Sequence, residues 1–130
     1  MNLTQAQNLL NKVQNEALSK EQSIAAAVVD SHGELIAYFK MDNCSPQAAL
    51  LAKNKAYTAA RDRQPSGNLG QWAKKTGRDL GYWTDKRMTG FKGGIPIEKQ
   101  GRVIGAIGIS GLSEDDDERL ALLAINKIGD

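Results

Sequence analysis

Two apolar runs near the C-terminus, residues 93–97 and 103–111, constrain the fold of this chain most strongly. The polar segment that joins them, residues 98–101, ends in a glycine that can adopt the positive φ of a hairpin with a bulge. The pattern therefore predicts a β-hairpin. Pro96 cannot donate a backbone hydrogen bond to a neighbouring strand, so the first strand of the hairpin should lie at a sheet edge or present this position outward.

The second strand of this hairpin has two unlike faces. Side chains alternate along a strand, so branched residues such as Ile107 and Ile109 share one face, while small residues such as Ala106 and Gly108 share the other. Glycine inside a strand is typical of places where a backbone, a helix or a ligand approaches closely. We therefore expect a central strand, with a second copy of the chain or a flat ligand pressed against its bare face.

The glycines at 105, 108 and 111 do not form a dinucleotide-binding motif. That motif is G-x-G-x-x-G in a strand-to-helix turn, whereas these glycines lie within a strand and precede the acidic run 114–118. Consecutive residues on a helix point in different directions, so the acidic run does not predict a metal site. We interpret it as a helix cap and a solvated surface.

The rest of the chain predicts alternating helices and hairpins. A capping box of Thr4 and Gln7 and helical spacing of apolar residues predict a first helix over residues 5–19. The other predicted elements are strands over 23–29 and 34–41, a helix from Ser45-Pro46 to Asp62, a short helix through residue 75, a short strand near 88–91, the hairpin, and a last helix capped by Ser113. Hairpins imply antiparallel pairing, so the predicted class is α+β, with one antiparallel sheet of about five strands.

The composition is that of a globular protein. The 130 residues predict a single domain, 1–130, and the fractions of 41% hydrophobic and 25% charged residues are ordinary. The sequence shows neither an apolar run long enough to span a membrane nor a secretory signal at its start, so we expect a cytoplasmic protein that does not contact membranes. Cys44 is the only cysteine, which excludes an internal disulfide and a cysteine metal cluster.

Positive charge and aromatic residues concentrate in the middle of the chain. Residues 53–92 hold ten basic and three acidic residues, a net charge of +7, together with Trp72, Tyr82, Trp83 and Phe91. Haem would use this combination, with aromatic faces against the macrocycle and cations on the propionates. Single-stranded nucleic acid and a subunit interface are the alternatives, since both favour the same residue types.

Few residues could ligate a metal or carry catalysis. His32 is the only histidine, and its place in a predicted tight turn favours an exposed side chain. Met41, Cys44 and Tyr57 are further candidates for a haem iron, although each is more simply explained by packing. No Ser-His-Asp arrangement, phosphate loop or H-E-x-x-H motif is present, which argues against hydrolysis.

Several of these segments together resemble a known family. They are 27–30, 32–35, 55–60, 93–97 and 103–111. In this order they closely resemble the GlcG/HbpS-like family, which also supplies the C-terminal domain of PduO-type cobalamin adenosyltransferases. The resemblance implies a profilin-like, three-layer α-β-α sandwich that forms dimers or higher oligomers, often octamers.

The resemblance also implies a range of functions. Several members of that family bind haem, some are reported to degrade it or to sense redox stress with it, and others belong to glycolate or diol utilisation operons. In the PduO-type domain, haem ligation is attributed to a histidine on the first helix. The first predicted helix of this chain has no histidine.

We therefore expect a homo-oligomer that binds haem or a related tetrapyrrole and has no nucleic-acid partner. The candidate cofactor-binding residues are His32, Trp72, Arg78, Tyr82, Trp83, Arg87, Phe91, Lys92, Gly93 and Gly94. One alternative is an accessory enzyme acting on a small carboxylate or diol-pathway metabolite, with Arg78, Arg87 or Lys92 on the anion. Another is a regulatory or structural subunit with no ligand. The residues leave open whether the protein is an enzyme.

Overall fold

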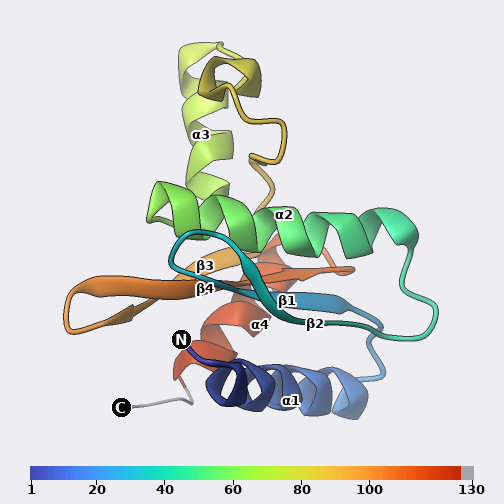
Figure 1. Ribbon diagram of the computed structural model, residues 1–130. Coiled ribbons are helices and arrows are strands. Elements are labelled where there is room, and N and C mark those ends of the chain that lie inside the picture. Colours follow the sequence, from blue (N-terminus) through green and yellow to red (C-terminus); the bar gives the residue numbers. More distant parts are fainter. Residues whose placement is uncertain (127–130) are drawn as a thin grey trace.

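The computed structural model describes residues 1–126, in which helices and strands alternate along the chain (Figure 1). The elements are α1 (Leu3–Ser19), β1 (Ala25–Asp30), β2 (Leu35–Lys40), α2 (Pro46–Asp62), α3 (Ser66–Thr76), the 3-10 helix η1 (Leu80–Trp83), β3 (Gly94–Lys99), β4 (Arg102–Ser110) and α4 (Glu114–Asn126). Within this part of the chain, every helix is too short or too polar to cross a bilayer.

The strands form one antiparallel sheet in the order β2-β1-β4-β3. The predicted hairpin is β3 and β4, and Pro96 lies on the edge strand β3, opposite Ala106. The α+β class is confirmed, but the sheet has four strands between residues 1 and 126 rather than about five. The predicted strand near 88–91 is a loop, because Thr89 N–H donates to Thr58 Oγ1 of α2 at 3.0 Å instead of to a strand.

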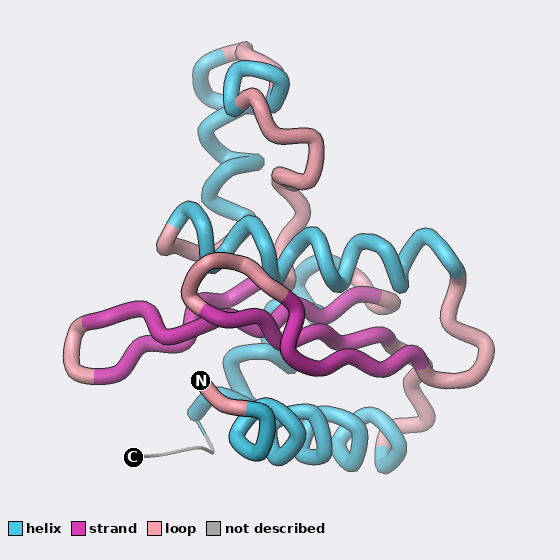
Figure 2. The backbone as a smooth tube through the Cα atoms, viewed as in Figure 1, coloured by secondary structure: helices cyan, strands magenta, loops and turns pink. Residues whose placement is uncertain are grey.

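The sheet is the middle layer of three (Figures 1 and 2). Helices α1 and α4 cover one face, where Leu9 and Val13 of α1 and Leu120 of α4 pack in one core with Ile107 and Ile109 of β4. Helix α2 covers the other face. The α-β-α sandwich expected from the sequence is therefore present.

The bare face of β4 lies against α2. A Cβ atom at Gly108 would collide with the backbone of Ala52 and Ala56, and Ala106 packs with Ala56 and Ala59. The expectation of a second copy or a flat ligand on this face is wrong, because a helix of the same chain occupies it. The glycine and the alanines let α2 approach the sheet closely.

The helix starts follow the expected capping chemistry with one correction. The N-cap of α1 is Asn2, not Thr4: Asn2 Oδ1 accepts from Gln5 N–H at 2.8 Å, and Gln5 Oε1 accepts from Asn2 N–H at 2.9 Å. In α2, Ser45 Oγ accepts from Ala48 N–H at 3.1 Å and Pro46 is the first helical residue, as predicted.

Residues 66–92, here called the arm, extend away from the sandwich beyond α2 (Figure 1). The arm contains α3 and η1 and returns to the sheet at β3. Its two ends are tied together by the buried residue Ser66, whose Oγ donates to Phe91 O at 2.6 Å and accepts from Gly94 N–H at 2.9 Å. Further along, Gly70 and Gly90 bring the two sides of the arm into backbone contact, since a Cβ on either glycine would overlap the other residue.

Candidate functional site

The end of the arm carries an aromatic cluster with a cation on it. Trp72 of α3 packs edge-on against Trp83 of η1, with ring centroids 5.6 Å apart, and against Tyr82 at 6.4 Å. The Arg78 guanidinium lies 5.3 Å from the Tyr82 ring centroid, and Tyr82 is 66% exposed. The structure thus brings together four of the predicted cofactor-binding residues. We call Trp72, Arg78, Tyr82 and Trp83 the tip cluster.

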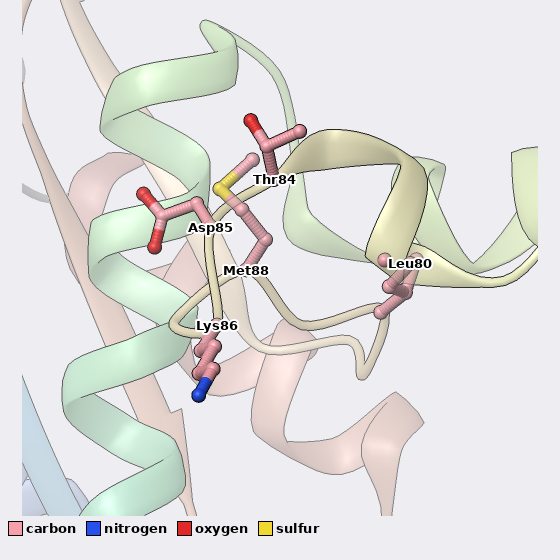
Figure 3. A pocket seen from close by; sticks show the side chains of 6 residues that line it. Leu80, Thr84, Asp85, Lys86 and Met88 are labelled. Carbon is pink, nitrogen blue, oxygen red and sulfur yellow. The ribbon is translucent and has the colours of Figure 1, made fainter.

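A hollow of about 460 Å³ lies beside the tip cluster, between η1 and the loop that follows it. Figure 3 shows Leu80 on one side of this hollow and the Asp85 side chain directed toward α2. A second hollow of about 300 Å³ is lined by both Trp83 and Arg61 of α2. It connects the tip cluster to the sandwich.

Tyr57 of α2 holds the returning side of the arm. Its hydroxyl donates to the Asp85 carboxylate and accepts from Arg87 Nη2 at 2.7 Å. The Arg87 guanidinium lies 3.8 Å from the Tyr57 ring centroid and that of Arg61 lies at 5.2 Å. Burial, reinforced by the hydrogen bond to Asp85, raises the pKa of Tyr57, and the same hydrogen bond lowers the pKa of Asp85.

His32 lies in the β1–β2 turn and is exposed, as the sequence predicted. The backbone N–H of His32 donates to Asp30 Oδ1 at 2.8 Å, and its backbone carbonyl oxygen accepts from Arg61 Nη1 at 3.3 Å. Arg61 thus contacts both the His32 carbonyl oxygen and the Tyr57 ring, and it lines a hollow together with Trp83.

The remaining predicted residues lie apart from the tip cluster. They lie near the junction where Ser66 contacts Phe91 and Gly94, which we call the neck of the arm. Lys92 Nζ pairs with Asp115 at 2.8 Å, and this hydrogen bond raises the pKa of Lys92. Gly94 is held by Ser66, a Cβ on Gly93 would lie 3.0 Å from Lys55 Cδ, and Phe91 is exposed. The predicted residues thus fall into three groups: the tip cluster, the surroundings of Tyr57, and the neck.

A buried ion pair between Lys55 and Asp117 escaped the sequence interpretation. Lys55 Nζ lies 3.0 Å from Asp117 Oδ2, and each side chain is only 2% exposed. Lys55 also donates to Ile109 O at 2.9 Å, and Asp117 accepts from Leu112 N–H at 3.0 Å. The reading of the acidic run as solvated is therefore wrong at Asp117, whose burial raises its pKa against the opposing effect of Lys55.

Few side chains near these sites suit a metal ion. Burial raises the pKa of both Cys44 and Tyr57. Met41 packs against the main core. Across residues 1–126, no three His, Cys, Asp or Glu side chains converge as a metal site would need.

Residues 1–126 match the family described as haem degrading protein HbpS-like. The chain belongs to the HbpS-like family. Among its relatives, protein GlcG of Escherichia coli K12 is 36% identical over 97 residues, which are 75% of this chain and 71% of GlcG. An uncharacterized 15.0 kDa protein from the dhaT-dhaS intergenic region of Citrobacter freundii is 31% identical over 127 residues, which cover 95% of this chain and 89% of the relative.

Solved structures agree with this assignment of the HbpS-like chain. Protein ORFY of Klebsiella pneumoniae superposes with a TM-score of 0.88 at 27% identity, covering 97% of this chain and 88% of ORFY. The PduOC:heme complex gives 0.86 at 25% identity, over 95% of this chain and 91% of PduOC. HbpS of Streptomyces reticuli, as a double mutant, gives 0.90 at 24% identity, over 100% of this chain and 88% of HbpS, which shows the shared fold. The family resemblance found in the sequence is confirmed.

Proposed function

We propose that this HbpS-like protein binds haem or a related tetrapyrrole as a homo-oligomer. The observation that carries the proposal is the similarity, over 95% of this chain, to PduOC, whose solved structure is a complex with heme. Family membership over residues 1–126 supports the same class of ligand.

The tip cluster offers an aromatic ring for the face of haem and a cation for the propionates at its edge. Tyr82 presents an exposed ring, with the Arg78 guanidinium beside it. Arg and Lys pair with carboxylates such as the propionates, and the arm also carries Lys74, Lys75 and Lys86. Bound haem would supply a redox-active iron. The arm would supply an aromatic surface and positive charge to hold it.

His32, the only histidine of the sequence, is the residue that would ligate a haem iron. The arm itself contains neither histidine nor cysteine. The backbone carbonyl oxygen of His32 accepts from Arg61, and Arg61 lines the hollow of about 300 Å³ together with Trp83. We propose that haem lies along this region and that His32 ligates its iron. The aromatic and basic residues of the arm suit the macrocycle and the propionates, whereas His32 alone is proposed for the iron.

A haemin titration followed by the Soret band tests this function. The wild-type protein is expected to shift and sharpen the band at micromolar protein. Arg78→Gln should weaken binding about tenfold, because it removes a charge-assisted contact to a propionate. His32→Ala should move the band position, because the axial ligand changes. Lys40→Gln, an exposed cation on β2, is the control. A wild-type protein that leaves the haemin spectrum unchanged would refute the proposal.

The second candidate is an accessory enzyme or a regulatory or structural subunit that does not use haem. It is favoured by the Citrobacter freundii relative, which is described by its place between dhaT and dhaS. Here Arg78, Arg87 or Lys92 would hold a small anion, although Lys92 is already paired with Asp115. Thermal-shift screening against glycolate, glyoxylate, glycerol-pathway acids and cobalamins separates this candidate from haem binding, because a ligand of the folded state raises the melting temperature.

A further inference from the structure

A hollow of about 320 Å³ lies between α2 and the β1–β2 turn, and Arg87 is the one residue of the arm among those that line it. We call it the α2 groove. Its lining includes Val29, Leu35, Leu50, Lys53, Tyr57 and Arg87. The groove contains no residue of the tip cluster.

One part of the α2 groove is apolar. Leu35 of β2 is 52% exposed and Leu50 of α2 is 47% exposed, and both line the groove together with the buried residue Val29. Single exposed leucines are common on protein surfaces. Leu35 and Leu50, however, border the same hollow, so an apolar ligand can cover both. Covering them stabilises the complex in proportion to the apolar area removed from water.

The other part of the groove is cationic. Arg87 and Lys53 line it, and both lie over aromatic rings, Arg87 over Tyr57 at 3.8 Å and Lys53 over Tyr38 at 5.1 Å. Arg87 Nη2 donates to the Tyr57 hydroxyl at 2.7 Å, and Arg87 Nε lies 3.9 Å from Asp85 Oδ1, so Nη1 is the nitrogen best placed to donate to a ligand. Glu34 also lines the groove. The groove therefore carries more positive than negative charge.

The glycine of the β1–β2 turn shapes the inner wall. Gly33 has a φ of +89°, and a Cβ placed on it would lie 2.8 Å from Tyr57 Cδ1 and 3.2 Å from Arg61 Cδ. A side chain at this position would displace the ring on which Arg87 rests. The close packing of the turn on Tyr57 thus helps to fix the ring under Arg87.

We propose that the α2 groove binds an amphipathic monocarboxylate. The apolar chain lies on Leu35 and Leu50, and the carboxylate pairs with Arg87 and Lys53. Charge selects the acid over an amine of the same length, and the leucines select a long chain over a short one. This site goes beyond the proposed haem function, and it assigns Arg87 to a carboxylate ligand distinct from a tetrapyrrole.

Octanoate is the probe, with octylammonium and acetate as matched comparisons. Titration of the ¹⁵N-labelled full chain should shift the backbone amide signals of Gly33, Leu50 and Arg87 with octanoate, and not with octylammonium or acetate at the same concentration. Arg87→Gln and Leu50→Gln should each weaken octanoate binding about tenfold. Leu18→Gln, an exposed leucine of α1 outside the groove, is the control and should leave binding unchanged.

Three outcomes would overturn the proposal. The first is an unchanged spectrum with octanoate, and the second is equal binding of octylammonium. The third is a loss of oligomer mass by Leu50→Gln or Leu35→Gln in light scattering, which would show that a second copy covers the groove. Both leucines are exposed, so these variants should fold. A haemin titration of Leu50→Gln reports separately on the haem proposal, which that substitution should not affect.

Discussion

At the scale of single residues, the buried pair of Lys55 and Asp117 is the most consequential feature. It joins α2, the end of β4 and the first turn of α4. Removing two charges from water is costly, and their attraction offsets this cost only when the other polar atoms are also satisfied. Ile109 O and Leu112 N–H satisfy them here.

Replacing one partner of this pair should cost more than replacing both. Asp117→Leu or Lys55→Met alone leaves a buried charge unpaired, and we expect a loss of about 3 kcal/mol or more in the free energy of unfolding, measured with urea. The double substitution should recover a large part of this loss. If the two single losses simply add in the double variant, the pair is not coupled as described.

Residue-level prediction from the sequence succeeded where local chemistry decides. Exposure of His32 followed from its place between turn residues. Asp117 was misread because its four acidic neighbours suggested a solvated surface, while its partner is distant in sequence. The available signal was Lys55 itself, a charged residue on the alanine-rich face of a predicted helix.

At the scale of the elements, local rules placed α2 between the right residues. Ser45-Pro46 and Pro65 are strong start and stop signals, and α2 begins at Pro46 and ends at Asp62. For α1 the capping box predicted at Thr4 and Gln7 was wrong, because Asn2 and Gln5, two residues earlier, form the box in the structure. The predicted strand near 88–91 failed because Thr58, far away in the chain, takes the N–H of Thr89.

The N-cap of α1 gives a test. Asn2→Ala should lower the free energy of unfolding by about 1 kcal/mol, because it removes the side-chain acceptor of the N-cap. Thr4→Ala, inside the helix, should change it by no more than a few tenths of a kcal/mol. Thermal or urea unfolding of the two variants decides the assignment, and a larger effect at Thr4 would reverse it.

The contact between the arm and α2 should depend on pH. The folded-state pKa of Asp85 is lowered from its ordinary value of 3.8, so its contribution to stability is present above pH 3.8 and is lost as the pH falls through the folded value. Asp85→Asn should cost about 1 kcal/mol near neutral pH. The difference from wild type should shrink below pH 3.8.

Tyr57→Phe provides the matched variant for this contact, since it removes the donor to Asp85 and leaves the carboxylate. Its stability difference from wild type should fade over the same acidic range. Urea unfolding at several pH values measures both variants. A difference that stays constant below pH 3.8 would show that the hydrogen bond does not govern the effect.

At the scale of the whole molecule, the antiparallel sheet was predictable because hairpins pair neighbouring strands in antiparallel orientation. The three layers were expected from the family resemblance. The occupant of the bare face of β4 was not predictable. Small residues show that something approaches closely, but they are equally suited to a ligand, a second chain or a helix. Only the three-dimensional structure identifies α2.

A subunit interface is the alternative to haem for the exposed aromatic ring at the end of the arm, and self-association tests it. Tyr82→Ser should weaken self-association at least tenfold, measured as a loss of mass in light scattering on dilution. Leu18→Ser on α1 is the control. Tyr82 is mostly exposed in the single chain, so the variant should keep its fold. An unchanged mass would exclude this ring from the interface.

The neck of the arm is the place where its two ends meet. Ser66 closes the junction through Phe91 and Gly94, and beyond it the chain makes one excursion and comes back to the same place. Because both ends of the arm meet at this junction, we expect a change in the length of α3 or η1 to leave the register of the four strands intact.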